Sequence, residues 1–292
     1  PHFFLNCLSL IHGIADKNHE GEIVEITTVL SDYMRYIFQD SKKQRNVEEE
    51  LEHIEAYIRI QKLRYGEEAF SFEATMDGDI GEWKVPSLLL QTLVENSVVH
   101  GVSLDRKSEI SLYLTNETYE DGEYLYICIS DTGNGFRKEA LDAIEHDTPI
   151  IYHGRHHVGI SNIKRRLALM YGERASITCS NMDETFVKAR AYLAQNYSDP
   201  ELSLTDLCHY LGFSCSYFST LFKQKTGLNY SHYITSLRLE QAARLLTDTD
   251  DTALSIGYQV GYSAPNYFSR AFKKFYGISP SRYREQNRVP TV

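Results

Sequence analysis

The chain has 292 residues, of which 42% are hydrophobic and 24% charged, with a formal net charge of −10. This length and composition allow two or three domains with apolar cores and exclude a mainly disordered chain. No apolar run approaches the roughly 18 residues of a membrane span, and no signal-peptide pattern is visible. The five cysteines are scattered without a CxxC spacing, which argues against a disulfide framework or zinc ribbon and for a reducing compartment.

The charge is unevenly distributed. Residues 185–292 contain 12 Lys and Arg against 8 Asp and Glu, a net charge of +4, whereas residues 1–184 carry −14. An acidic first part and a basic last part predict domains with different partners. Because the sequence starts at Pro1 rather than Met, we expect a fragment. We place it in the cytoplasm, with membrane attachment only through a segment upstream.

Residues 1–65 have helical periodicity. Apolar residues at 29, 30, 33, 34 and 37 form one stripe, and those at 51, 54, 57, 58 and 63 form another in a helix that starts near Val47. The polar stretch QDSKKQRN separates the two. The pattern predicts an antiparallel helical hairpin, whose apolar surface also suits dimerisation.

Residues 66–185 alternate between strand and helix patterns. FSFEATM predicts a strand, residues 86–100 a helix, and EISLYL and LYICIS two strands separated by the turn-rich NETYEDG. The Gly-rich DTGNG follows, then a polar segment, a helix at SNIKRRLALMYG and a strand at ASITCS. This order predicts an α/β sandwich.

Residues 186–292 contain only helix patterns and an internal repeat. LGFSCSYFSTLFKQKTG matches VGYSAPNYFSRAFKKFYG, and a helix at about 231–246 links the two copies. Each copy predicts a helix-turn-helix unit with Gly212 or Gly261 in its turn. The residues expected to pack the two units are Leu207, Leu211, Phe213, Phe218 and Phe222 in the first and Ile256, Val260, Tyr262, Phe268 and Phe272 in the second.

The helix LLLQTLVENSVVHG at 88–101 carries polar groups where a core helix should be apolar. At 3.6 residues per turn, Asn96 and His100 share a face with Leu89 and Leu93. One interpretation is that Asn96 holds Mg²⁺, which takes oxygen ligands and shares them with phosphates. The other is that Asn96 and His100 form local hydrogen bonds at a helix end, and the stretch alone leaves both open.

Two further motifs favour a nucleotide. In DTGNG, Asp131 ends a strand, where its carboxylate can accept from the exocyclic amine of adenine, and Gly133 and Gly135 permit left-handed backbone and close approach to a ring. The alternative is a simple Asp-Gly turn. In VGISNIKRRL, Gly159 precedes a helix whose N-terminal N–H groups suit phosphate.

These motifs in this order resemble the GHKL (Bergerat-type) ATP-binding domain of histidine kinases. VENSVVHG resembles the N box, DTGNG the first Gly box and HVGISN the second. PHFFLN at 1–6 and VEEELEHIEAYIRIQKLRYG at 47–66 resemble the phosphoacceptor motif and second dimerisation helix of the LytS/YesM-type sensor kinases. The resemblance covers residues 1 to about 185.

The resemblance implies ATP-dependent autophosphorylation. His2 would receive the γ-phosphoryl group and pass it to an Asp of a response-regulator receiver domain. Asn96 would hold Mg²⁺, Glu95 would orient or deprotonate the attacking imidazole or assist at the metal, and Asp131 would recognise adenine. Residues 136–157 would form the ATP lid. The remaining nucleotide-binding residues implied are His100, Gly133, Gly135, Gly159 and Asn162.

Two departures from the family pattern favour an alternative, a transcription regulator with a degenerate, inactive kinase module. His157 stands where the second Gly box has its first glycine, and only Thr185 matches the final Gly-Thr-led strand. A metal site at His153, His156 and His157 is a further alternative, but no Cys or carboxylate stands at a convincing spacing.

The second helix of each repeat leaves polar and basic residues exposed. Short polar side chains and Arg at i, i+3, i+4 spacing can reach base edges, and Lys reaches phosphate. The candidates for DNA contact are Ser216, Ser219, Thr220, Lys223, Asn266, Tyr267, Arg270 and Lys273. The alternative is a plain helical bundle with a solvated face, against which the duplication and the local charge argue.

YSAPNYFSRAFKKFYGISPSRYR at 262–284 resembles the signature of the AraC/XylS-family DNA-binding domain. That family implies seven helices, with two recognition helices in successive segments of the major groove. We therefore predict a multidomain signalling fusion: a dimerising helical hairpin (1–65), a GHKL-type domain (66–185) and a double helix-turn-helix domain (186–292). No receiver pattern is visible, so we expect the phosphoryl acceptor to be elsewhere or lost. An artificial junction of two genes near residue 185 is the third interpretation.

Overall fold

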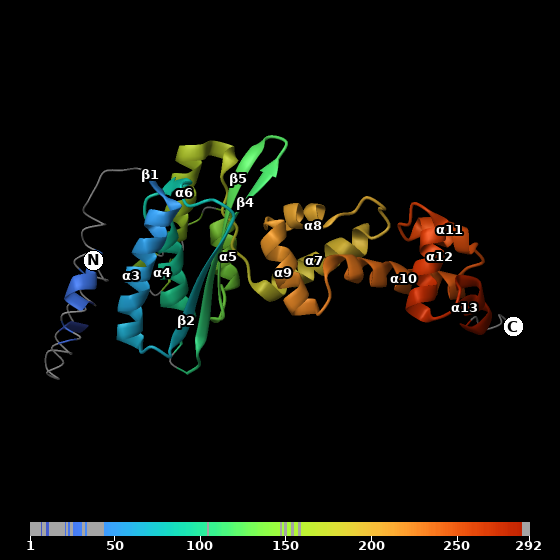
Figure 1. The fold of residues 1–292 in the computed structure, drawn as a ribbon, viewed down its shortest axis with the longest axis horizontal. Coiled ribbons are helices and arrows are strands. Elements are labelled where there is room, and N and C mark those ends of the chain that lie inside the picture. The colour runs from blue at the N-terminus through green and yellow to red at the C-terminus, as the bar shows by residue number, and fades with distance from the viewer. Residues whose placement is uncertain are drawn as a thin grey trace. The chain divides into compact units, whose positions relative to one another are not determined.

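The computed structural model describes residues 7, 10–11, 21, 23, 26–30, 33, 44–103, 105–146, 148, 151–152, 155–156 and 159–287. The chain divides into two compact units, Pro1–Ser180 and Asn181–Val292 (Figure 1). Helix α7 (Met182–Asn196) begins directly after this division and contains both Thr185 and Phe186. Much of the predicted helical hairpin, including His2, lies outside the described residues.

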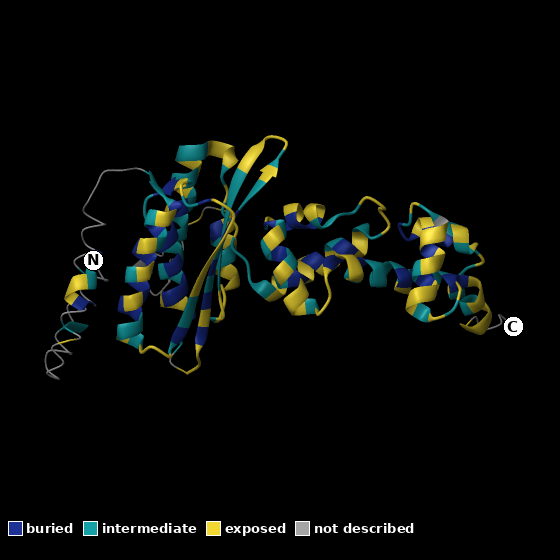
Figure 2. Cartoon of the chain, in the orientation of Figure 1, coloured by how far each residue is buried: buried dark blue, intermediate teal, exposed yellow. Residues whose placement is uncertain are grey.

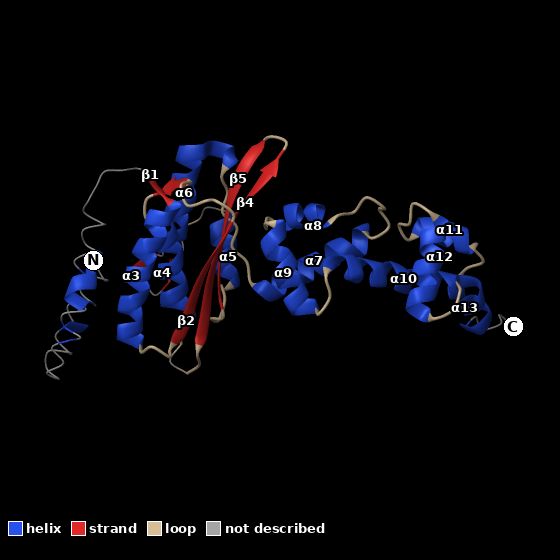
Figure 3. Ribbon diagram, viewed as in Figure 1, coloured by secondary structure: helices blue, strands red, loops and turns tan. Residues whose placement is uncertain are grey.

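A three-stranded sheet forms the frame of the first unit (Figure 3). Its order is β2 (Phe70–Asp77), β4 (Ser108–Tyr119) and β5 (Gly122–Asp131), with β2 parallel and β5 antiparallel to β4. The three strands predicted from alternation are confirmed. The predicted turn NETYEDG is wrong for most of its length, because β4 pairs with β5 as far as Tyr119 and only residues 120–121 make the turn.

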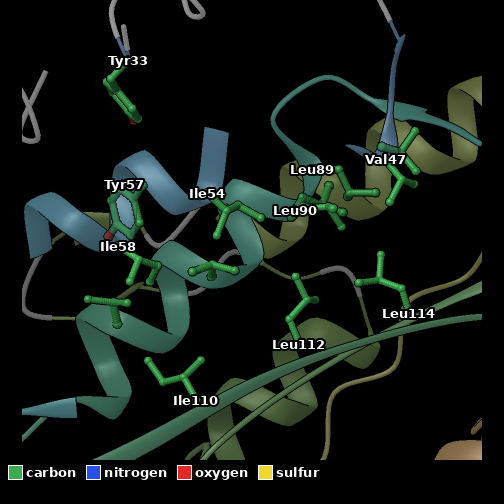
Figure 4. Packing of buried hydrophobic residues seen from close by; sticks show 14 of the residues in the cluster. Tyr33, Val47, Ile54, Tyr57, Ile58, Leu89, Leu90, Ile110, Leu112 and Leu114 are labelled. Carbon is green, nitrogen blue, oxygen red and sulfur yellow. The ribbon is translucent and has the colours of Figure 1, made fainter. Parts of the chain in front are cut away.

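Helices cover the apolar face of this sheet. Ile110, Leu112 and Leu114 alternate along β4 and are buried, and α3 (Val47–Tyr65) and α4 (Leu89–Gly101) contribute apolar residues to the same core (Figure 4). The burial is striped along both helices (Figure 2). Helix α4 contacts α3, both β4 and β5, and α6 (Gly159–Tyr171), so it is the central helix of the unit.

Some elements differ from the sequence prediction. The polar link before Val47 contains β1 (Gln44–Asn46), which pairs antiparallel with β3 (Lys84–Pro86). The predicted lid contains α5 (Lys138–Glu145) and the two-residue strands β6 (Ile151–Tyr152) and β7 (Arg155–His156). The predicted strand ASITCS is wrong: after η1 (Gly172–Arg174), residues 175–180 have no regular structure and pair with none of the described strands.

In its described part, residues 181–287, the second unit contains seven helices, α7 to α13, the number that the resemblance implies. The first helix-turn-helix unit is α8 (Leu204–Leu211) and α9 (Cys215–Thr226), and the second is α11 (Ala253–Gln259) and α12 (Pro265–Tyr276). Helix α10 (Tyr230–Asp248) links them, and α13 (Pro280–Asn287) follows. Gly212 and Gly261 take left-handed backbone in the two turns, with φ of 74° and 89°.

The repeat extends to the packing. The ten predicted core residues lie in two clusters, with Phe213 and Tyr262 partly buried and the others buried. Phe222 meets Tyr233 edge-on at 5.2 Å between ring centroids, and Phe272 meets Tyr283 edge-on at 5.3 Å. Within the described residues of both units, no helix is long and apolar enough to cross a membrane.

Candidate functional site

The start of α4 is fixed by a side chain from α3. Leu88, just before the helix, has a left-handed backbone with φ of 62°, which is strained for a residue with a Cβ. The fully buried carboxylate of Glu50 accepts from the N–H of Leu88 at 2.7 Å and from that of Leu90 at 3.2 Å. A carboxylate at a helix N-terminus satisfies otherwise unpaired donors and favours the helix dipole. Helix α4 is thereby held in place against α3.

Asn96 lies where α4 meets the start of α6. A Cβ added to Gly159 would stand 3.2 Å from Asn96 Nδ2 and 3.4 Å from Oδ1, so the side chain of Asn96 lies against the first residue of α6. Nδ2 also donates to the carbonyl of Thr92 at 2.8 Å, which is the local hydrogen bond of the alternative interpretation. That bond engages the amide nitrogen, so Oδ1 is the atom suited to a cation. Asn96 is half-buried rather than enclosed.

The other end of α4 meets the Gly-rich loop after β5. A Cβ on Gly101 would stand 2.7 Å from Asp131 Oδ1, and one on Gly133 would stand 2.5 Å from the Cα of Gly101. Asp131 Oδ1 accepts from the N–H of Gly133 at 2.9 Å. Two glycines therefore let the loop lie directly on the helix, with the exposed carboxylate of Asp131 beside it.

The two loop glycines have different physical roles. Gly135 has φ of 70°, a left-handed conformation that favours glycine, whereas Gly133 has no positive φ and is required by the close approach of Gly101. Left-handed backbone is therefore found at Gly135 and not at Gly133. Gly101 closes the stretch that resembles the N box, and its lack of a side chain at the helix end is what allows its contact with Asp131.

Glu95 is half-buried on α4, and burial raises the pKa of its carboxyl. A raised pKa suits a group that is to accept a proton near neutral pH. His100 and Asn162 are exposed, His100 at the end of α4 and Asn162 in the first turn of α6. The face shared by Leu89, Leu93, Asn96 and His100 is thus the border of the core rather than its centre.

Several predicted features lie outside the described residues: His2, part of the lid, and His153 and His157. Among the described residues, no group of three His, Cys, Asp or Glu could hold a metal ion. An open hollow of about 560 Å³ is lined by residues that include Tyr65, Glu68, Ser103 and Arg106. None of the predicted nucleotide-binding residues lines this hollow.

In the second unit, the predicted DNA-contact residues lie on α9 and α12. Ser219 is half-buried and the others are exposed, with Tyr267 at 70%. Phe268 and Phe272 anchor the opposite side of α12, which leaves Arg270 and Lys273 facing outward. Within residues 159–287, neither cation forms an ion pair, whereas Lys225 pairs with Asp183 at 3.0 Å. Each second helix thus presents an accessible surface of hydroxyl, amide and cationic groups.

Comparison with protein families gives two matches. Residues 1–69 match the model described as histidine kinase, and residues 207–286 match the model described as helix-turn-helix domain. The raffinose operon transcriptional regulatory protein RafR of Pediococcus pentosaceus is 43% identical over 102 residues, 35% of this chain and 36% of that protein. The sensor histidine kinase YpdA of Escherichia coli is 30% identical over 178 residues, 59% of this chain and 29% of that protein.

The sensor protein LytS of Oceanobacillus iheyensis is 30% identical over 187 residues, 63% of this chain and 31% of that protein. The chain thus spans about a third of the length of these relatives. Among solved structures, the C-terminal domain of AraT, a response regulator from Geobacillus stearothermophilus, is 35% identical over 38% of this chain and 91% of that one, with a TM-score of 0.36.

Proposed function

Because the chain joins a segment of the histidine kinase family to a helix-turn-helix segment of the AraC type, we propose that it is a two-component signalling protein that autophosphorylates on histidine and binds specific DNA. The observation that carries the kinase part is the convergence on α4. Asn96 touches the start of α6 at Gly159, and Gly101 touches Asp131 and Gly133 at the end of β5. Three motifs that are distant in sequence thus meet along one helix.

The separation along α4 suits an extended nucleotide. Asn96 and Gly101 are five residues apart, which corresponds to roughly 7.5 Å along a helix axis. Adenine would bind at the Asp131 end, its amine donating to the carboxylate, with the ring over the closely packed Gly101 and Gly133. The phosphates would lie toward the N-terminus of α6, whose N–H groups favour anions. This nucleotide-binding set belongs to a GHKL-type α/β sandwich.

For phosphoryl transfer, the imidazole of His2 would attack the γ-phosphorus of ATP in line, the bond to the β-phosphate oxygen would break, and ADP would leave. Asn96 Oδ1 would hold Mg²⁺, which neutralises the charge on the phosphates when bound. Glu95, one residue before Asn96, would orient His2 or accept its proton. An Asp of a receiver domain on another protein would take the phosphoryl group.

The DNA part rests on α9 and α12. Arg270 would contact base edges in the major groove, where a guanidinium pairs bidentately with guanine, and Lys223 and Lys273 would contact phosphates. Helix α10, which links the two helix-turn-helix units, has 19 residues and is therefore roughly 28 Å long. A linker of that length would suit recognition helices in successive turns of the groove on one face of the duplex.

A second candidate is a DNA-binding regulator whose kinase-like part binds nucleotide without transferring phosphate. Helix α7 favours it, because this helix occupies the place where the resemblance implies the final Gly-Thr-led strand, and the described sheet ends at β5. Incubation with ATP labelled in the γ-phosphate separates the two candidates. The kinase predicts an acid-labile label in the native chain and none in His2→Gln, with α-labelled ATP as the control for simple binding. A chain that binds ATP yet takes no label would establish the second candidate.

A further inference from the structure

One polar group of α4 has no role in the proposed nucleotide set. Gln91 is 6% exposed and lies one turn before Glu95, within a core of apolar side chains. Its Oε1 lies 2.7 Å from Nε2 of His53 on α3, and its Nε2 donates to the hydroxyl of Tyr33. The amide therefore joins three segments of the chain through both of its ends.

The partners of Gln91 are as deeply buried as Gln91 itself. His53 is 4% and Tyr33 3% exposed, and their rings stack with 4.5 Å between centroids and 16° between planes. Burial lowers the pKa of His53 to about 4, so its imidazole is neutral at pH 7. A neutral ring that carries its proton on Nε2 donates to Gln91 Oε1, which leaves the amide nitrogen to donate to Tyr33. We call Tyr33, His53 and Gln91 the polar seam.

Such a seam restricts how the segments can slide. Apolar packing is non-directional and tolerates small shifts, whereas hydrogen bonds require defined distances and angles. In this core a displaced donor finds no water, so a shift of Tyr33 against α4 would cost the buried amide of Gln91 its hydrogen bond to the tyrosine hydroxyl. Buried polar groups of this kind select one register among several apolar alternatives.

The polar seam lies between the N-terminal segment and the helix that carries the proposed catalytic residues. Tyr33 belongs to the N-terminal segment that is predicted to carry the phosphoacceptor His2, and α4 carries Glu95 and Asn96. Gln91 and Glu95 are four residues apart on α4 and so lie one turn from each other on the same face of the helix, which places the seam next to the proposed catalytic carboxyl.

We propose that Gln91 is a positioning residue for autophosphorylation: by joining Tyr33 and His53 it sets the register of the phosphoacceptor segment against the nucleotide-binding helix. This inference rests on the proposed kinase function. Phosphoryl transfer depends strongly on placement, and a displacement of about 1 Å can cost about 100-fold in rate. Gln91 touches no nucleotide, so its loss should lower the transfer rate and leave nucleotide affinity nearly unchanged.

The test uses the full chain and three variants. Gln91→Met removes the amide at nearly constant volume. The triple variant Tyr33→Phe, His53→Phe and Gln91→Met replaces the whole seam by apolar groups and keeps the ring stacking. Gln61→Met, which removes an equally buried amide from α3 outside the seam, is the matched control. For each we would measure the melting temperature, the Kd for ATP and the rate of labelling on His2 at saturating ATP.

Gln91→Met should melt at a lower temperature and label about 100-fold more slowly, with less than about threefold change in Kd. The triple variant should regain most of the melting temperature, because the three polar groups that pair with one another are removed together, but it should still label slowly. If the triple variant recovered both its labelling rate and its melting temperature, the seam would be only structural and the inference would be overturned. A loss of rate in Gln61→Met equal to that in Gln91→Met would also overturn it. A native chain that binds ATP but is never labelled would overturn the kinase proposal itself, and the inference with it.

Discussion

Protonation of His53 is expected to destabilise the first unit as the pH falls. Burial lowers the pKa of this imidazole from 6.5 to about 4, so between these values the unfolded chain binds a proton that the folded chain does not. The free energy of unfolding therefore decreases as the pH falls through this window. A difference of about 2.5 pKa units corresponds to about 3 kcal/mol in full, of which about 2 kcal/mol should be lost by pH 5.

The chain contains one tryptophan, which makes the assay selective. Trp83 packs against the core of the first unit, so its fluorescence in urea titrations reports on that unit and not on the helical one. The native chain should be compared with His53→Phe between pH 7.5 and 5. Because both chains share their carboxylates, the difference in unfolding free energy isolates the imidazole.

Between pH 7.5 and 5, the unfolding free energy of the native chain should fall by about 2 kcal/mol relative to that of His53→Phe. His146→Gln, which replaces an exposed imidazole in the same unit, should keep the native dependence on pH. A difference between the native chain and His53→Phe that stays constant within about 0.5 kcal/mol would show that His53 does not lose its proton on folding.

Three further predictions address the two proposed sites. Gly133→Ala should raise the Kd for ATP at least about tenfold in calorimetry, because its Cβ would stand 2.5 Å from a backbone atom of α4. Gly159→Ala, whose Cβ would meet its nearest contact at 3.2 Å, should raise the Kd less. An equal rise in Kd for the two variants would contradict the packing argument. In anisotropy titrations, Arg270→Ala should reduce the difference in binding free energy between preferred and altered DNA sequences by about 1–3 kcal/mol. Lys273→Ala should weaken binding to all DNA sequences alike and reduce the slope of log affinity against log salt concentration by about 1. An unchanged sequence preference in Arg270→Ala would refute the proposed contact of Arg270 with base edges. His157→Gly should raise the rate at which His2 is labelled, because it restores the glycine that the second Gly box has at this position. An unchanged rate would show that His157 does not impair phosphoryl transfer.

Local signals in the sequence were sufficient where a segment determines its own structure. The alternation of Ile110, Leu112 and Leu114 identifies a strand with one buried face, and the repeat around Gly212 and Gly261 identifies two helix-turn-helix units. In both cases the period of apolar residues and the turn residues are contained in one short stretch.

Features that depend on distant partners were not predictable. Residues 175–180 alternate like a strand, but a strand exists only when another edge pairs with it, and within the described residues none does. The pairing of Gln44–Asn46 with Lys84–Pro86 is equally invisible, since each stretch is only three residues long. The sequence also showed that Gln91 interrupts an apolar face, but not that its partners come from α3 and from Tyr33.

The two departures from the kinase pattern are unequal in their consequences. The proposed nucleotide residues lie on α4, at the end of β5 and at the start of α6, and all of them precede residue 175. The missing final strand, whose place α7 occupies, removes none of these residues, so it can weaken the kinase only through a less stable sheet. His157 stands two residues before Gly159, where the α6 N-terminus meets Asn96. We therefore expect the histidine at position 157, rather than the missing final strand, to have the larger effect on the rate at which His2 is labelled.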